Sequence, residues 1–311
     1  MCLIKRHLQS KPKAARSSLF QNKTAFAYFL LTPQVIILLV FMVFPILSSL
    51  AISFTGLDFA RPKIGMPFVG LDNYIKAVTS KNFLESIQRT IYFTGMSVSL
   101  TIIMGLGFAS ALTKPAPGVK FIRAIIIIPW AVPAVISGLM WRWIFNAQWG
   151  PLNGILMQLG IIDSYQSYLS RPFLALNVIV LANLWKQVPF AVLMCIAALS
   201  TIPEDLFEAA KVDGANPLQA FWSITLPLIM PSLAVLMVLS TAWSFFAFDL
   251  VYAITEGGPA NATTILPYFA YLRIFKFLKF GEGAAIGYII TLVVLILGYL
   301  YMKLIYREVK Y

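Results

Sequence analysis

The chain has 311 residues, of which 59% are hydrophobic and only 12% are charged, and its mean hydropathy is +0.82. About a quarter of the residues of an average soluble domain are charged, so the composition excludes a soluble globular protein and indicates an integral membrane protein. The net charge of +12 does not require a nucleic-acid partner, and none is expected, because Lys and Arg gather in the cytoplasmic loops of membrane proteins.

The side chains that carry most catalytic and metal chemistry are scarce. His7 is the single histidine, and Cys2 and Cys195 lie in a polar tail and an apolar run respectively. A zinc site or a histidine base needs companions that the sequence does not supply. We therefore expect no catalytic residue, no metal site and no cofactor bound by this chain.

The N-terminal part contains a basic tail and a first membrane span. Residues 1–24 hold six Lys and Arg and no acid, and residues 25–54 are almost entirely apolar. This run is longer than a signal-peptide core of about 7–15 residues, so it is predicted to be an uncleaved transmembrane helix. The basic tail is then cytoplasmic, and the polar residues 55–89 form an external segment.

Five further apolar runs are long enough to cross the membrane, since about 20 helical residues suffice. They cover residues 90–113, 121–145, 172–199, 229–253 and 284–306. The sequence therefore predicts an all-α membrane protein with about six transmembrane helices, and a five-helix core at 90–306.

Six spans place both termini in the cytoplasm, which agrees with the basic residues of the second connection and of the C-terminal tail 307–311. The apolar segment 265–280 carries three basic residues, and crossing the membrane there would move the C-terminus outside. We predict that it is an interfacial external helix.

The loop at 200–228 is a long polar interruption of the apolar second half. Pro203, two following acids and Gly214 suit the start and the left-handed end of one short helix. Leu206, Phe207 and Ala210 are expected on one side of it. Asn216 and Pro217 favour a second short helix, ending near Trp222. Physical reasoning alone is equally compatible with an ordinary surface hairpin.

The spacing within this loop resembles the signature of permease subunits of bacterial binding-protein-dependent ABC importers. Glu208-Ala209-Ala210, Gly214, Ile224 and Leu226-Pro227 fill every position of the pattern EAA-x3-G-x9-I-x-LP. The resemblance implies a type I ABC importer permease fold, whose cytoplasmic EAA helix couples to an ATPase. The coupling residues it implies are Leu206, Phe207, Glu208, Ala209, Ala210, Asp213 and Gly214.

Three further motifs resemble the carbohydrate-uptake branch of these permeases. They are Phe68 to Tyr74 (FVGLDNY), Trp141 to Asn146 (WRWIFN) and Thr255 to Pro259 (TEGGP). The resemblance implies sugar import across the bacterial inner membrane by a non-catalytic subunit. The partners it implies are a second permease subunit, expected to form a heterodimer with this one, two ATPase subunits that use ATP and magnesium, and an extracytoplasmic binding protein.

Two polar and aromatic stripes lie on neighbouring predicted spans. Residues at helical spacing form one stripe on the fourth span and another on the fifth: Asn183, Lys186, Gln187 and Phe190, and then Trp243, Ser244 and Ala247. In the permeases that the chain resembles, the corresponding faces line the sugar cavity. The alternative is that these residues hold neighbouring helices together.

Several questions stay open at this stage. Lys186 could favour an anionic cargo or could pair with a carboxylate, and Asp249, near the external end of its span, could bind sugar hydroxyls or pair with a base. Arg142 is expected to extend toward the external surface. An ion-coupled secondary transporter, an ABC permease for a non-carbohydrate solute and a membrane enzyme are the competing functions. The sequence does not name the sugar.

Overall fold

A computed structural model describes residues 23–114 and 116–305. Every regular element within these ranges is a helix. Five of the helices are long and apolar enough to cross a membrane, and the number is six if one bent pair is counted as a single span. This confirms the predicted all-α class with about six spans. The predicted tail at 307–311, and all but the last two residues of the tail at 1–24, lie outside the described residues.

The chain divides into two compact units, the first ending at Ala51 and the second beginning at Ile52. The described part of the first unit is helical throughout: α1 (Lys23–Leu38), the π-helical turn η2 (Leu39–Val43) and most of α2 (Phe44–Ser53). The most apolar part of Thr24–Ser53 has a mean hydropathy of 2.9. Such a helix of 30 residues is long enough to cross a hydrocarbon layer.

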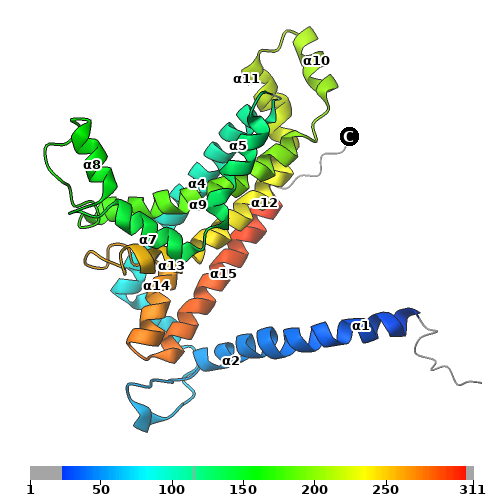
Figure 1. Cartoon of the computed structure of the whole chain (residues 1–311). Coiled ribbons are helices and arrows are strands. Elements are labelled where there is room, and N and C mark those ends of the chain that lie inside the picture. Colours follow the sequence, from blue (N-terminus) through cyan, green and yellow to red (C-terminus); the bar gives the residue numbers. More distant parts are fainter. Residues whose placement is uncertain (1–22, 115, 306–311) are drawn as a thin grey trace, which may run out of the picture. The chain divides into compact units, whose positions relative to one another are not determined.

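The second unit contains the remaining helices. In chain order they are η3 (Pro62–Ile64), α3 (Asp72–Thr79), α4 (Lys81–Thr113), α5 (Val119–Ile126), α6 (Ile128–Ala131), α7 (Ala134–Ile144), α8 (Pro151–Gln158), α9 (Pro172–Leu199), α10 (Glu204–Val212), α11 (Pro217–Ala220), η4 (Phe221–Thr225), α12 (Leu226–Phe245), α13 (Phe248–Ile254), α14 (Leu266–Tyr271), η5 (Leu272–Lys276) and α15 (Phe280–Ile305). Figure 1 shows α10 and α11 at one end of this unit, and α8, α13 and α14 toward the other.

Helix α9 is the centre of the second unit. It packs against α4, α6, α7, α12 and α13, and 61% of its most apolar window is buried, against 22–39% for the other long helices of this unit. The face of α4 toward the core carries small residues, which let membrane helices approach closely. They are Thr90, Thr94, Ser97, Thr101, Gly105 and Ala109. The two predicted stripes lie on α9 and α12. They are therefore neighbours within one packed core.

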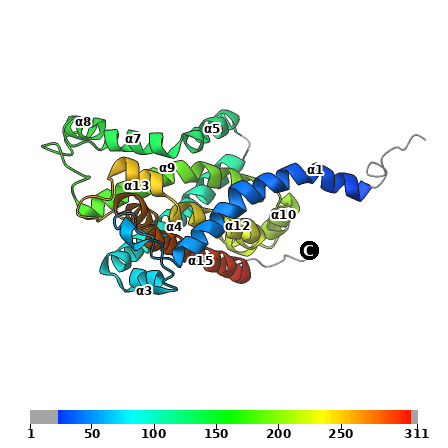
Figure 2. The same ribbon diagram turned by 90° about the horizontal axis from the view of Figure 1, so that it is seen from below.

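The third span is broken, which corrects the prediction of one continuous helix over 121–145. The segments Val119–Ala131 and Ala134–Ile144 meet at an angle of 96°. Pro133 supplies the physical reason, because it has no N–H to donate and it pushes the preceding residue out of the helical region. Val132 accordingly has an extended backbone, with φ −69° and ψ 130°. Figure 2 shows α5, α7 and α8 in a row along one side of α9.

Other predicted boundaries also differ from the structure. Helix α4 begins at Lys81 rather than at residue 90. Ser80 caps this start, because its hydroxyl accepts a hydrogen bond from Phe83 N (3.3 Å). The fifth span ends at Phe245 rather than near 253, and α13 follows as a separate helix. The second short helix of the loop does not end near Trp222, because the π-helical turn η4 joins it to α12. Apolarity continues past Trp222 and past Phe245, so the composition did not reveal these two boundaries, whereas the polar residues 81–89 made the first turns of α4 resemble an external segment.

The segment 265–280 forms α14 and η5 and packs on the core. Leu266, Tyr268 and Phe269 are buried, while Arg273 and Lys276 lie in the last turn. Five helices and the bent pair account for the candidate spans, and this segment is not one of them.

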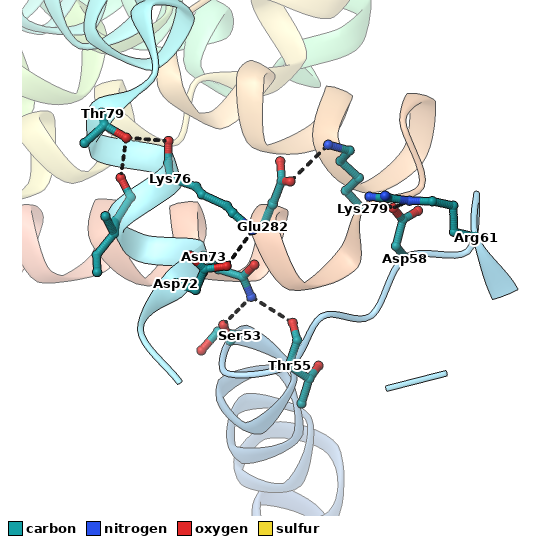
Figure 3. A network of polar contacts seen from close by, with 11 residues as sticks. Ser53, Thr55, Asp58, Arg61, Asp72, Asn73, Lys76, Thr79, Lys279 and Glu282 are labelled. Carbon is teal, nitrogen blue, oxygen red and sulfur yellow. Dashed lines mark hydrogen bonds and ion pairs between the residues drawn. The ribbon is translucent and has the colours of Figure 1, made fainter. Parts of the chain in front are cut away.

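A buried asparagine joins three segments of the second unit (Figure 3). Asn73 on α3 is 4% exposed, and its Nδ2 donates to the carbonyl oxygens of Ser53 and Thr55, both at 2.8 Å. Gly281, at the start of α15, lies directly behind these groups and donates its N–H to Leu57 O (3.2 Å). The FVGLDNY motif therefore fixes the turn after α2 against α15.

Ion pairs surround this junction, and several appear in Figure 3. Asp58 pairs with Arg61 at 3.0 Å, and Glu282 pairs with Lys279 (3.0 Å) and Arg273 (3.4 Å). Burial by itself raises the pKa of Asp58. The hydrogen bonds from Arg61 and Ala60, together with the charges of Arg61 and Lys279, lower this pKa by more than burial raises it, so it lies below its ordinary value. The carboxylate is therefore ionised at neutral pH.

The close packing behind Asn73 predicts a position-specific effect of adding one methyl group. A Cβ at position 281 would overlap the carbonyl oxygen of Thr55, whereas a Cβ at Gly287 on the same helix meets nothing within 4 Å. We expect Gly281→Ala to lower the free energy of unfolding by about 1–3 kcal/mol and Gly287→Ala to leave it unchanged. Thermal unfolding of the purified protein in detergent measures both; equal midpoints would contradict the packing.

Candidate functional site

The two predicted stripes meet at a cavity of about 430 Å³ in the core. It lies where α9 faces the end of α12 and the break between α6 and α7. Its lining consists of Trp130, Ala134, Asn183, Lys186, Gln187, Trp243, Phe246, Ala247, Asp249 and Leu250. Of the seven predicted pathway residues, Asn183, Lys186, Gln187, Trp243 and Ala247 line the cavity.

Ser244 and Phe190 are in the second layer instead. Ser244 is fully buried, and its hydroxyl oxygen lies 3.3 Å from Asn183 Nδ2 and 3.2 Å from Gln187 Nε2. Gln187 Nε2 also donates to Asn183 Oδ1 at 3.0 Å. The amides thus hold α9 against α12 and line the cavity at the same time, so the two readings of the stripes do not exclude each other.

Two aromatic rings, those of Trp130 and Trp243, form one wall of the cavity, and Phe190 lies behind them. Phe190 stacks on Trp130 with centroids 5.7 Å apart and meets Trp243 edge-on at 5.0 Å. Trp130 and Trp243 remain 45% and 37% exposed, so parts of their rings are available to a bound molecule. Phe190 therefore supports the two tryptophans, which lie on different helices. Such a wall suits the C–H surface of a sugar ring.

Lys186 has a partner within the fold. Its ammonium donates a hydrogen bond of 2.6 Å to the carbonyl oxygen of Val132, at the break before Pro133. A backbone carbonyl left without a donor inside a membrane costs several kcal/mol. Lys186 satisfies this carbonyl, and it also ties the cavity wall formed by Trp130 and Ala134 to α9.

Five lining residues were not among the predicted pathway residues: Trp130, Ala134, Phe246, Asp249 and Leu250. The two prolines at 129 and 133 are the sequence signal that could have indicated a break beside the site. The link at Phe246 and Ala247 contains no Gly or Pro, so no local signal marks it. Asp249 falls in the first turn of α13 because of that link.

The loop 200–228 forms a helical hairpin at one end of the second unit. Helix α10 ends before Gly214, whose φ of +78° is the left-handed conformation that only glycine adopts without strain. The Asn216 side chain accepts from Gln219 N (2.9 Å), and Asn216 N donates to Gln219 Oε1 (2.8 Å). This capping box starts α11 and sets the return of the chain toward the core.

The faces of α10 differ from the prediction. Phe207 and Ala210 face the bundle as expected, but Leu206 points away and is 39% exposed. Glu204 and Lys211 lie on the same inner face as Phe207 and Ala210. These four residues line a cavity of about 700 Å³ under the hairpin. Residues 204, 207 and 211 are three and four positions apart, so they form one helical face.

The outer surface of the hairpin combines exposed apolar side chains with acids. Val212 is 88% exposed and Leu218 is 67% exposed, and Glu208, Ala209, Asp213 and Gly214 are exposed as well. Exposed apolar surface that is rimmed by polar residues is typical of sites that contact a protein or a membrane. All seven predicted coupling residues therefore lie on one projecting element, with Phe207 and Ala210 partly covered.

An ion pair joins two of the other motifs. Arg142, at the end of α7, contacts Glu256 with 3.1 Å between Nη1 and Oε1. Glu256 belongs to the TEGGP turn that follows α13, and α7 and α13 pack against each other. Arg142 therefore has a protein partner outside the cavity, and it does not line the cavity.

The chain matches a family model and named relatives. The family model described as "Binding-protein-dependent transport system inner membrane component" matches residues 101–311. The trehalose/maltose transport system permease protein MalF of Thermococcus litoralis is 38% identical over 92% of this chain and 96% of its own length. The sn-glycerol-3-phosphate transport system permease protein UgpA of Brucella abortus is 33% identical, over 94% of this chain and 98% of its own.

Another relative and two solved structures extend the comparison. The sulfoquinovosyl glycerol transport system permease protein SmoG of Agrobacterium fabrum is 33% identical over 90% of each chain. A chain of a bacterial ABC transporter involved in alginate import has a TM-score of 0.77, with 22% identity over 92% of this chain and 96% of that one. A chain of the MetNI methionine ABC transporter reaches 0.51, with 16% identity over 71% and 94%. These structures share the type I ABC permease fold with this chain.

The second layer of the cavity predicts different effects for two serines on α12. Replacing Ser244 by Ala removes the hydroxyl shared by Asn183 and Gln187, so we expect a loss of about 1–2 kcal/mol in the free energy of unfolding. Ser240, one turn earlier, is buried and its hydroxyl has no hydrogen-bond partner among the described residues. Ser240→Ala should therefore be neutral or slightly stabilising. Thermal unfolding in detergent compares the two variants, and a larger loss for Ser240→Ala would overturn this assignment.

Proposed function

The chain belongs to the family of binding-protein-dependent transport system inner membrane components, and on that premise we propose that it forms half of the pathway of an ATP-driven sugar importer. Two features of the second unit, taken together, carry the proposal. The complete EAA pattern lies on a projecting hairpin at one end of the second unit, and a cavity with an aromatic wall lies in the core. A surface for an energy-supplying partner and a chamber for a cargo would therefore belong to the same compact unit.

The coupling surface consists of the exposed side of α10 and the turn after it. Glu208 offers a carboxylate to a basic partner, Val212 and Leu206 offer apolar contact area, and Gly214 sets the angle of the return. Complementary charge would orient the ATPase subunit, and the apolar contacts would hold it. ATP and magnesium would be used by that partner, and this subunit would not be catalytic.

The cavity suits a polyhydroxylated cargo. Ring faces of Trp130 and Trp243 would contact C–H surfaces, and the amides of Asn183 and Gln187 would exchange hydrogen bonds with hydroxyl groups. The names of the relatives support a carbohydrate or a glycerol derivative, since they include trehalose, maltose, sn-glycerol-3-phosphate and sulfoquinovosyl glycerol. An ion-coupled secondary transporter is not favoured by this family membership.

The remaining parts of the assembly follow from this role. A second permease subunit would complete the pathway, two ATPase subunits would dock on the EAA hairpins, and an extracytoplasmic binding protein would deliver the cargo. The hairpin would face the cytoplasm together with both termini, in agreement with the positive-inside rule. Closure of the ATPase pair would then move the hairpin and open the cavity alternately to each side.

The coupling role predicts a loss of transport without a loss of membrane insertion. The double variant Glu208→Ala, Gly214→Ala removes the anchoring carboxylate and strains the turn, since alanine tolerates φ +78° poorly. We expect ATP-dependent uptake to fall at least 100-fold in vesicles holding the complete complex. The matched control is Asp163→Ala, Gly95→Ala, in which the acid is exposed on a loop away from the hairpin and the glycine has open space. Normal uptake by the hairpin variant would exclude the docking role.

The cavity role predicts a change in cargo handling rather than in assembly. Trp243→Ala removes one ring of the aromatic wall, and we expect the uptake rate to fall about tenfold, because ring stacking and its buried area are lost. Asn183→Leu and Gln187→Leu should change the rates for different sugars unequally. ATPase activity of the complex without cargo serves as the control for assembly. Unaltered uptake kinetics in all three variants would remove the cavity from the pathway.

A further inference from the structure

We propose that a small cavity at the external end of the second unit binds a carboxylate, and that this carboxylate belongs to a side chain of the extracytoplasmic binding protein. The cavity has a volume of about 150 Å³ and lies between the start of α4 and the segment from Asn261 to Phe277. The inference rests on the import function proposed above, in which residues 55–89 and 265–280 face the outside. It adds a docking site that family membership does not specify.

The cavity is polar and opens to the surface. Its lining includes buried residues (Ser86, Thr264 and Phe269), exposed ones (Asn82, Asn261 and Phe277) and, between them, Glu85, Leu272, Arg89 and Arg273. None of these residues lines the cavity beside α9. The volume is below the range of sites for whole small molecules, which begins at about 300 Å³. The cavity therefore suits a single functional group that enters from outside.

Arg273 is held in place but keeps unused donors. Its guanidinium carbon lies 4.9 Å from the ring centre of Phe269 and 5.6 Å from that of Phe277. Its Nη1 lies 3.4 Å from Glu282 Oε2 as an ion pair, and the guanidinium donates no hydrogen bond to any residue in 23–114 or 116–305. Five N–H donors in a planar fork match the two oxygens of a carboxylate. Two rings thus orient a fork whose donors are free.

Arg89 also has donors left over. Its Nη2 donates to Glu85 Oε2 at 2.8 Å, and this is the one hydrogen bond that its guanidinium makes with the part of the chain that the structure describes. The side-chain amides of Asn82 and Asn261 make none with the same residues, so each can add an N–H donor. The cavity therefore presents donors of two arginines and two amides to a group that enters it.

The charges around the cavity are not balanced. Four cations surround two acids: Lys81, Arg89, Arg273 and Lys279 with Glu85 and Glu282. Each acid contacts two of the cations, at distances between 2.8 and 4.0 Å. The pair of Asp58 with Arg61 beside them cancels itself. The side chains of Arg89 and Arg273 are only 20% exposed, and a half-buried charge without a full partner is costly. A carboxylate in the cavity would reduce this excess.

The surface beside the cavity favours a protein as the source of the carboxylate. Phe275, Phe277 and Leu278 are 64%, 50% and 40% exposed, next to the charged groups of the cavity. Exposed apolar surface rimmed by polar residues is typical of contact sites, and a charged pair beside apolar contacts sets the orientation of a docked protein. Basic residues are normally depleted outside the membrane. In the proposed cycle, the binding protein is the partner that reaches this end.

The test measures the dissociation constant of the purified binding protein from the complete complex in lipid nanodiscs. Arg89→Gln and Arg273→Gln each remove one guanidinium from the cavity, and Arg89→Lys keeps the charge but loses the fork. The matched control is Arg61→Gln. It removes an arginine that is also paired with an acid, at 3.0 Å from Asp58, but that does not line the cavity.

We expect the dissociation constant to rise about tenfold in Arg89→Gln and in Arg273→Gln, less in Arg89→Lys, and less than about twofold in Arg61→Gln. Added salt should weaken binding to the unmodified complex more than binding to Arg89→Gln. The thermal midpoint and the ATPase activity without binding protein should be unchanged in Arg89→Gln, which separates docking from folding. Arg89→Gln decides the outcome if Arg273→Gln unfolds.

A charge swap identifies the partner group. Arg89→Glu should bind one Asp→Arg or Glu→Arg variant of the binding protein more tightly than it binds the unmodified binding protein. Equal dissociation constants in Arg89→Gln, Arg89→Lys and the unmodified complex would overturn the inference. So would stabilisation by acetate or phosphate that depends on Arg89 while binding-protein affinity does not, because the site would then take a free anion. If the unmodified complex bound no binding protein and showed no ATP-dependent uptake, the proposed function itself would fail.

Discussion

The hydrogen bond from the Lys186 ammonium to the Val132 carbonyl is the contact on which the cavity depends. A transmembrane helix normally satisfies all its backbone groups internally, and a break exposes groups that lipid cannot satisfy. Pro133 creates the break, and Lys186 supplies the missing donor from α9. Because the break carries Trp130 and Ala134, the same bond that repairs the backbone also holds one wall of the chamber in place.

The polar groups of the core serve packing and recognition together. The Ser244 hydroxyl oxygen accepts hydrogen bonds from the side-chain amides of Asn183 and Gln187, and both of these residues also line the cavity. A bound molecule that replaced these hydrogen bonds would alter the contact between α9 and α12 directly. If the cavity holds the proposed cargo, shared donors would couple its binding to the packing of α9 against α12.

The two ends of the second unit differ in how firmly their segments are held. At one end, α10 projects with exposed apolar and acidic side chains, and its inner face covers a cavity rather than packing tightly (Figure 1). At the other, Asn73 and the ion pairs of Glu282 tie the turn after α2 to the start of α15 (Figure 3). Few buried contacts hold the hairpin, so it is suited to move, whereas buried hydrogen bonds make the opposite junction rigid.

The sequence by itself determined the membrane class, the number of apolar spans and the EAA hairpin with its Gly214 turn, and it selected five residues that line one cavity of the structure. Composition, helical spacing and turn chemistry are local properties, so they can be read directly. Only the tertiary structure decided that the third span bends at Pro133, that Lys186 satisfies the Val132 carbonyl, and that Asp249 lines the same cavity as Lys186, whose charge acts on it. Each of these depends on a partner from a distant segment, because a buried polar group is explained by what it faces and not by its neighbours along the chain.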